Sequence, residues 1–183
     1  MTVIRCVSPV NGEVYAEREA LSEAAAFAAV EPARKAQTAW AALPLQTRID
    51  KVLAGVKALN DMKPRVVEEL AWQMGRPVRY GGEYGALNER ADYMTSIAAS
   101  ALEPLVAEAS DRFERRIEWD PQGIVFVIAP WNYPVANALM DAIGALAAGC
   151  AVLLKPSERT PLTAELLLRG WLESGAPDVF ALA

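Results

Sequence analysis

The chain has 183 residues, of which 53% are hydrophobic, and its formal net charge is −5. This length can form one domain with a sizeable core, and a negative charge without a dense basic patch excludes a nucleic-acid footprint. The absence of histidine excludes a histidine-dependent triad or zinc site within this chain. Its two cysteines, Cys6 and Cys150, lie far apart without metal or redox spacing, so we expect inert buried thiols and no disulfide.

The N-terminal part predicts a hairpin followed by an interrupted helix. Two short extended segments lie within residues 3–15, around the turn signal Asn11-Gly12. Ser22 is a good helix N-cap, but Pro32 falls inside a pattern that would otherwise be one long helix. We therefore predict two helical pieces there.

Three further helices are predicted by apolar residues that recur at steps of three and four. They cover residues 45–59, 64–74 and 83–102. Pro64 lies in the first turn of the second of these helices, and Gly75 ends it. We interpret the apolar stripes as faces that pack into a core.

A strand is predicted at residues 113–119, where large side chains alternate with charged ones. Phe113, Ile117 and Trp119 share one face of it. With the turn at Asp120, this strand either pairs as a hairpin or leads directly into the next strand. The pattern indicates an edge strand with an exposed aromatic side chain.

A strand, a helix and a second strand follow in order. The apolar run 124–129 predicts a strand buried on both faces, a helical pattern continues to Gly149, and residues 151–154 predict another buried strand. Open α/β sheets bind ligands beyond the carboxyl ends of their strands. The two polar clusters, at 131–132 and 155–158, stand at those ends.

The last segment predicts a helix and a third apolar strand. Thr160 is a candidate cap for a helix that begins at Pro161 and ends near Gly175, and the strand covers residues 178–183. A parallel strand at an abrupt terminus leaves a sheet incompletely covered, so we expect a fragment of a longer fold. The apolar segment 134–154 is not expected to span a membrane, because it divides into a helix and a strand.

Three motifs, IAPWNYP, ALAAGC and LLKPSERTPLTA, resemble in order and spacing the NAD(P)-dependent aldehyde dehydrogenase superfamily. SPVNGEV and the MGRP at 74–77 resemble, more loosely, the family's N-terminal hairpin and the end of its second long helix. The resemblance implies an α/β fold whose truncated sheet is the first βαβαβ half of a Rossmann-like parallel nucleotide-binding sheet. It implies an N-terminal hairpin and helical region at 1–110, a strand of an oligomerisation arm at 111–120, and that half-sheet at 121–183.

The resemblance also implies roles for the polar clusters. Asn132 matches the asparagine that stabilises the oxyanion of a thiohemiacetal, and Lys155 and Glu158 match residues that hold the adenosine ribose. The expected cofactor-binding set is Ile128, Ala129, Pro130, Trp131, Asn132, Lys155, Ser157 and Glu158, with main chain at 128–131 on the nicotinamide side. No G-x-G-x-x-G follows the first strand, and the family does not use one there.

Plainer interpretations of these residues stay open. Asn132 beside proline can satisfy local backbone groups, and Lys155 with Glu158 can be a solvated ion pair of little energetic consequence. If the ribose role holds, the carboxylate of Glu158 would repel a 2′-phosphate, so NAD is favoured over NADP.

We therefore expect the N-terminal part of a cytoplasmic, dimeric or tetrameric aldehyde dehydrogenase that oxidises an aldehyde to a carboxylate with NAD. We expect no metal, nucleic acid or membrane partner. The chain alone is expected to be inactive, because the family's catalytic cysteine and general-base glutamate would lie downstream. The alternatives are a non-catalytic interaction or dimerisation module and a truncated product without an independent role. The apolar residues at 135–139 are only a weak hint of an uncharged substrate.

Overall fold

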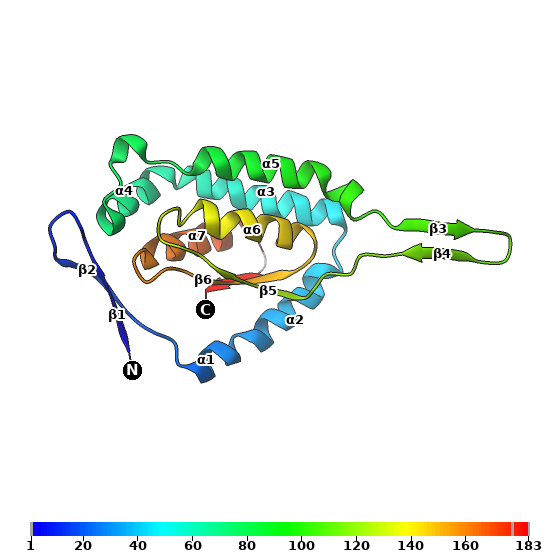
Figure 1. The fold of residues 1–183 in the computed structure, drawn as a ribbon, viewed down its shortest axis with the longest axis horizontal. Helices are drawn as coiled ribbons and strands as arrows, with labels where there is room; N and C mark the ends of the chain where they lie inside the picture. The colour runs from blue at the N-terminus through cyan, green and yellow to red at the C-terminus, as the bar shows by residue number, and fades with distance from the viewer. Residues whose placement is uncertain (1, 177, 183) are drawn as a thin grey trace.

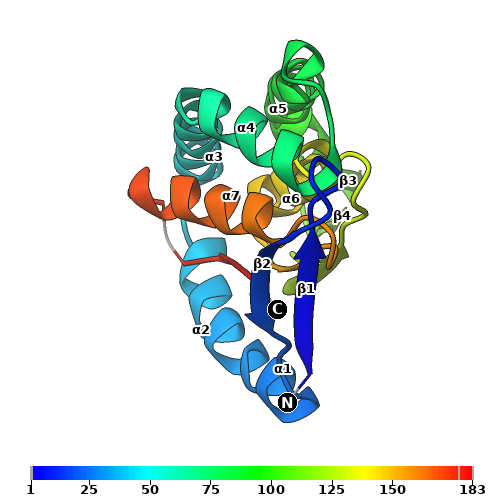
Figure 2. The same cartoon turned by 90° about the vertical axis from the view of Figure 1, so that its left-hand side faces the viewer.

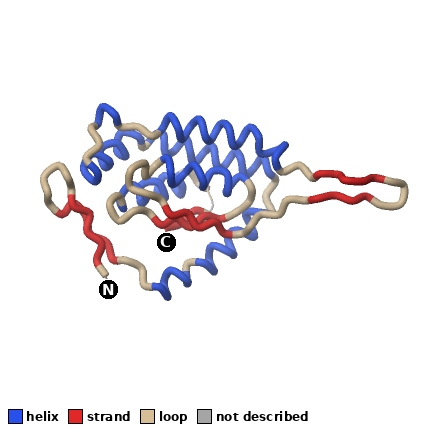
Figure 3. The backbone as a smooth tube through the Cα atoms, in the orientation of Figure 1, coloured by secondary structure: helices blue, strands red, loops and turns tan. Residues whose placement is uncertain are grey.

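The computed structural model describes residues 2–176 and 178–182. In it, helices surround a parallel sheet, and two antiparallel hairpins extend from opposite ends of this body (Figure 1). Figure 3 shows the same arrangement by secondary structure, with the strands of the sheet at the centre. The chain thus has the mixed α/β architecture that its sequence predicts.

The first hairpin pairs β1 (Val3–Val7) with β2 (Val14–Glu19), as predicted. Gly12 has a φ of 76° in the connecting turn, a conformation that glycine adopts without strain. The register shifts between Cys6 and Val7, which leaves Tyr15 of β2 without an opposite residue, so the bulge lies on β2.

The predicted interruption of the next helix is confirmed, but its position differs. Helix α1 (Glu23–Ala28) ends before α2 (Val30–Ala41) begins, and the break falls at Ala29 rather than at Pro32. Pro32 lies in the first turn of α2, where backbone N–H groups have no partner within the helix, so it does not interrupt the ladder. Ser22 caps α1 as predicted, because its side chain accepts from the amide of Ala25 at 3.2 Å.

Three helices follow close to their predicted bounds: α3 (Leu45–Asp61), α4 (Lys63–Met74) and α5 (Tyr84–Ala101), with a short 3₁₀ turn η1 (Val78–Tyr80) before the last. Gly75, with a φ of 76°, ends α4 in the left-handed conformation.

The predicted strand at 113–119 is β4 (Glu114–Ile117), and its partner is β3 (Leu105–Ala109), which the sequence did not predict. The turn of this hairpin therefore precedes β4, and the chain leads from β4 through Asp120 into the sheet. Of the two predicted alternatives, the direct connection is correct and a hairpin turn at Asp120 is wrong. Figure 1 shows the hairpin extending far beyond the helices.

The central sheet has the order β5-β6-β7, and all its strands are parallel. Helices α6 and α7 pack on one face, and α2 packs on the other (Figure 1). Figure 2, turned by 90°, shows the first hairpin in front, with α7 and α2 well apart. The elements are β5 (Ile124–Ile128), α6 (Ala136–Ala147), β6 (Ala151–Lys155), α7 (Pro161–Glu173) and β7 (Phe180–Leu182). The third predicted strand therefore begins later than expected, and its last predicted residue, 183, lies outside the described residues.

The prediction that both central strands are buried on both faces is correct for β6 and wrong for β5. Val152 and Leu154 are buried, but Phe126 is 56% and Ile128 66% exposed. Phe126 lies on the face that opens onto a cavity beside the N-terminal hairpin and α1, where α2 does not cover the strand. The apolar run at 124–129 indicates a strand, but it does not indicate which parts of the chain cover the two faces of that strand.

One hydrophobic core joins the N-terminal helices to the sheet. It includes Trp40, Leu87, Leu139, Leu154 and Phe180, which come from α2, α5, α6, β6 and β7. Within residues 2–176 and 178–182, no helix is long and apolar enough to cross a membrane.

Candidate functional site

Two loops lie next to each other at the carboxyl ends of β5 and β6. Ile128 is in register with Lys155, and the amide of Ala129 donates to the carbonyl oxygen of Lys155 at 3.0 Å. Further out, the guanidinium of Arg159 lies 5.3 Å from the centre of the Trp131 ring. The structure therefore brings the two predicted polar clusters together at one edge of the sheet.

The second loop presents a cation and a carboxylate side by side. The Nζ of Lys155 donates to the carboxylate of Glu158 at 2.6 Å and to the carbonyl oxygen of Pro156 at 3.1 Å. This hydrogen bond from Lys155 is the main reason why the pKa of Glu158 is lowered below its ordinary value. Both side chains remain open to solvent, so the pair can offer donors and an ionised acceptor to a ligand.

A cavity of about 690 Å³ borders this pair. Its volume lies within the range typical of small-molecule sites. Its lining is mostly apolar and includes Phe126 and Leu153, and its polar lining residues are Thr2, Glu23, Lys155, Ser157 and Glu158. An apolar cavity with a few polar side chains in its lining suits a ligand that has both an apolar and a hydroxylated part.

The first loop carries Asn132, which is exposed. Its backbone oxygen accepts from Nη2 of Arg76 at 2.5 Å. Within the described part of the chain, no hydrogen bond engages its side-chain amide, so this amide is not satisfying local backbone groups. It remains able to donate to a ligand oxygen.

Two residues that sequence reasoning did not select shape this loop. Arg76 forms an ion pair with Glu83, and the carboxylate of Glu83 accepts from the amides of Val135 and Ala136 at 2.8 and 2.7 Å. The role of Glu83 could not be predicted from local sequence patterns, because the amides that it binds lie 52 and 53 residues away. The MGRP motif marked the position of Arg76 without indicating its contacts.

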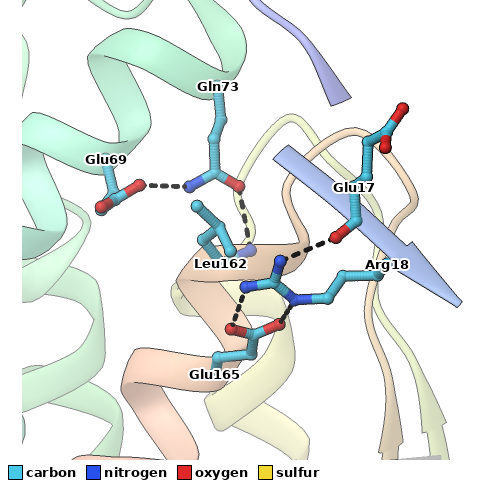
Figure 4. A network of polar contacts seen from close by, with 6 residues as sticks. All are labelled: Glu17, Arg18, Glu69, Gln73, Leu162 and Glu165. Carbon is cyan, nitrogen blue, oxygen red and sulfur yellow. Dashed lines mark hydrogen bonds and ion pairs between the residues drawn. The ribbon is translucent and has the colours of Figure 1, made fainter. Parts of the chain in front are cut away.

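The predicted side-chain cap at Thr160 is wrong. Thr160 precedes α7, but its side chain makes no capping bond, and its backbone is not in the extended conformation typical of a cap. Gln73 of α4 caps α7 instead: its Oε1 accepts from the amide of Leu162 at 3.0 Å, and its Nε2 donates to Glu69 at 3.1 Å (Figure 4).

Figure 4 also shows how the first hairpin is attached to α7. The guanidinium of Arg18 on β2 holds both carboxylate oxygens of Glu165 on α7, at 2.5 and 2.8 Å. Together with Gln73, this contact fixes the start of the helix that follows the Lys155–Glu158 loop.

Both cysteines are free and buried. The Sγ of Cys6 donates to the carbonyl oxygen of Arg159 at 3.1 Å, and burial, with a smaller contribution from Glu69, raises the pKa of this thiol. The thiolate is the nucleophilic form, so this environment disfavours reaction at Cys6. Cys150 is 4% exposed at the junction of α6 and β6. Over the described residues, no group of three or more cysteine and carboxylate side chains could hold a metal ion.

Comparison with known proteins finds relatives that match nearly the whole chain. A probable succinate-semialdehyde dehydrogenase (NADP+) of Sinorhizobium fredii is 33% identical over 175 residues, which are 93% of this chain and 35% of that protein. The crystal structure of a NAD-dependent benzaldehyde dehydrogenase from Corynebacterium glutamicum matches 100% of this chain and 42% of its own, with 28% identity and a TM-score of 0.88. An aldehyde dehydrogenase from Brucella melitensis biovar abortus 2308 matches 100% and 38%, with 25% identity and a TM-score of 0.91.

The chain therefore spans between a third and a half of the length of these relatives. The family model described as the aldehyde dehydrogenase family matches residues 1–181. This chain belongs to the aldehyde dehydrogenase family.

Proposed function

We propose that the chain is the N-terminal part of an aldehyde dehydrogenase that oxidises an aldehyde to a carboxylate with NAD. The observation that carries this proposal is the Lys155–Glu158 pair at the end of β6, beside the loop that carries Asn132. Family membership supports the reaction class. Among the relatives, one structure is named as NAD-dependent and the Sinorhizobium protein is named with NADP+, so the preference for NAD rests on Glu158.

The residues present fit a dinucleotide. A carboxylate can accept from both hydroxyls of a ribose, and an ammonium can donate to them, so Glu158 and Lys155 would hold the adenosine ribose. The adjoining cavity would take the adenine, and the main chain of Ile128, Ala129, Pro130 and Trp131 would face the nicotinamide half. Ser157 lines the same cavity. The bound cofactor supplies the acceptor for the hydride.

In this proposal Asn132 stabilises negative charge on the substrate oxygen. Its amide donates to the aldehyde oxygen as that oxygen becomes an oxyanion, a contribution that typically accounts for ~10²–10³ in rate. Neither Cys6 nor Cys150 serves as the nucleophile, because both are buried. We therefore propose that residues 1–183 bind cofactor without oxidising aldehydes.

A second candidate function is a dimerisation module, and the hairpin β3–β4 favours it. All residues of both strands are exposed. Large apolar side chains on and beside this hairpin are between 45% and 57% exposed: Leu105, Val106, Phe113, Ile117 and Trp119. We propose that a second copy of the chain covers this apolar arm. Light scattering should then show a dimer or tetramer, and the double substitution Val106→Lys with Ile117→Lys should reduce it to the monomer.

The proposed location is the cytoplasm. Two buried thiols that form no disulfide are compatible with a reducing compartment.

The test of the cofactor role is a calorimetric titration of residues 1–183 with NAD. Glu158→Ala and Lys155→Ala should each weaken binding by about tenfold, the loss expected for one charge-assisted hydrogen bond. Glu173→Ala is the matched control, because it removes an equally exposed carboxylate from an ion pair with Arg169. This control should bind NAD like the unmodified chain.

The outcome separates the candidates when thermal unfolding is measured in parallel. A cooperative transition without NAD binding would contradict the cofactor role and favour the dimerisation module. Absence of both a cooperative transition and NAD binding would favour the interpretation that the chain is a piece of a longer protein with no independent role.

A further inference from the structure

The backbone between Asn132 and Ala136 is held by a buried ion pair from another part of the chain. The side chain of Glu83 is 1% exposed and that of Arg76 is 14% exposed. Both residues lie between the end of α4 and the start of α5, and both contact the segment that leads from β5 into α6. The pair thus connects the helical region to the loop that carries Asn132.

Glu83 joins two helix N-termini. Its carbonyl oxygen accepts from the amide of Leu87 in the first turn of α5. Its Oε2 accepts from the amides of Val135 and Ala136, which begin α6 and have no acceptor within that helix. A carboxylate at this place also satisfies the positive end of the helix dipole. The position of α6, and of the residues just before it, is therefore tied to Glu83.

Arg76 holds the same segment at two further points. One nitrogen of its guanidinium binds Oε1 of Glu83, while the other donates to the backbone oxygen of Asn132 at 2.5 Å. The guanidinium also lies 4.9 Å from the centre of the Tyr133 ring. Only the planar fork of arginine can make these contacts together, since a lysine ammonium lacks this geometry.

We propose that Arg76 and Glu83 are positioning residues that fix the backbone at 132–136 and so hold Asn132 in place to donate to a substrate oxygen. The proposal rests on the oxyanion role proposed for Asn132 and names the residues on which that role depends.

Stability alone does not account for this pair. Burying two charges costs desolvation free energy, and hydrophobic residues in place of a buried ion pair are often as stable or more stable. Capping α6 would need only a short polar side chain at its N-terminus. Arg76 adds contacts to Asn132 and Tyr133 that capping does not require.

The test compares Arg76→Lys and Glu83→Gln in residues 1–183 by NMR. The measured quantities are the side-chain amide signals of Asn132 and hydrogen exchange at the amides of Val135 and Ala136. Arg79→Met is the matched control, because Arg79 lies 4.7 Å over the exposed ring of Tyr80 and makes a similar cation–π contact away from the loop.

Arg76→Lys should keep the pairing with Glu83, and with it the thermal midpoint, but shift the Asn132 side-chain signals. Glu83→Gln loses an acceptor, so exchange at Val135 and Ala136 should accelerate by about tenfold while the core of α5 stays protected. Arg79→Met should change none of these quantities.

Unchanged Asn132 signals in both Arg76→Lys and Glu83→Gln would overturn the proposal. Should Glu83→Gln fail to fold, Arg76→Lys decides alone. NAD titration of the same variants keeps the two proposals apart. If the substitutions shift the Asn132 signals but the chain does not bind NAD, the positioning role is supported and the cofactor role is contradicted. If the chain binds NAD but the Asn132 signals do not shift in either variant, the cofactor role is supported and the positioning role is contradicted.

Discussion

The indole ring of Trp171 lies directly against Gly55, where α7 crosses α3. A Cβ on Gly55 would stand 2.5 Å from the ring. A similar close approach occurs at Gly170, where a Cβ would meet Leu59 and Met62 at 2.8 Å. The ring also packs edge-on against Phe180, with ring centres 6.1 Å apart. The side chain of Trp171 therefore contacts both helix α3, at Gly55, and strand β7, at Phe180.

Gly55→Ala should destabilise the chain by about 1–3 kcal/mol, the usual cost of overpacking a close contact. The added methyl group forces either the Trp171 ring or helix α3 to move. The free energy of unfolding in urea measures this cost.

Gly85→Ala is the control for this substitution, because Gly85 is also helical but nothing lies within 4 Å of its added Cβ. There the change should be neutral or stabilising by up to about 1 kcal/mol, as expected from helix propensity. Equal effects of the two substitutions would contradict the close contact at Trp171.

Arg48 should contribute strongly to stability by satisfying backbone carbonyl groups. It is 9% exposed, and it donates to the carbonyl oxygens of Ala147 at 3.0 Å, Ala41 at 3.2 Å and Leu43 at 2.6 Å. These groups lie at the ends of α6 and α2, where carbonyls lack partners within the helix. Burial lowers the pKa of Arg48, but an arginine remains charged in a folded protein.

Arg48→Met should lower the free energy of unfolding by about 3 kcal/mol, because hydrogen bonds from a charged donor are lost and buried carbonyls are left unpaired. Denaturant unfolding measures the loss. Arg34→Met, on the exposed side of α2, should change the free energy by less than about 0.5 kcal/mol. A similar small effect at Arg48 would show that water replaces its hydrogen bonds.

The sequence predicted most helices because each carries a periodic apolar face and a recognisable end, as at Gly75. It also predicted β4, but it predicted no element over residues 105–109, where β3 lies. The pairing of β3 with β4 depends on both segments, so it cannot be predicted from the residues of either segment alone. The same reason explains why the burial of β5 was predicted incorrectly.

The candidate site shows the same division. Asn132, Lys155 and Glu158 were selected from motifs, and the structure brings their loops together. Glu83 was not selected, because its importance comes from amides that are distant in sequence. Gln73 was missed for the same reason, since it caps a helix that begins 88 residues later, at Pro161. Local patterns predict elements, and they do not predict polar contacts between elements.

Glu158→Gln should shift cofactor preference from NAD toward NADP. The carboxylate of Glu158, whose pKa is lowered mainly by the hydrogen bond from Lys155, is ionised at neutral pH and would repel a 2′-phosphate. Removing the charge should increase the ratio of NADP affinity to NAD affinity by roughly tenfold. Parallel calorimetric titrations measure both affinities, with Glu173→Gln as the exposed control. An unchanged ratio would mean that this carboxylate does not face the ribose.

Tyr84 should make the chain lose stability at alkaline pH. It is 3% exposed, and within the described part of the chain its hydroxyl has no hydrogen-bond partner. Burial, with a smaller contribution from the neighbouring Glu83, raises the pKa of this phenol, although the Nζ of Lys63 lies 5.7 Å from the centre of its ring. The folded chain therefore keeps a proton that the unfolded chain loses above its ordinary pKa of 10.0.

The ionisation of Tyr84 should consequently give the free energy of unfolding no pH dependence below that pKa, and should lower this free energy by up to about 1.4 kcal/mol per pH unit above it. Tyr84→Phe should remove this slope and, because an unpaired hydroxyl is no longer buried, stabilise the chain by about 1 kcal/mol at neutral pH. A smaller alkaline decline should remain from Cys6 and Tyr15, because burial also raises the pKa of each of these groups. Urea unfolding between about pH 8 and pH 11 measures the slope, with the exposed Tyr93→Phe as control. If Tyr84→Phe keeps the slope of the unmodified chain, the phenol is hydrated in the folded state and its burial is not the cause.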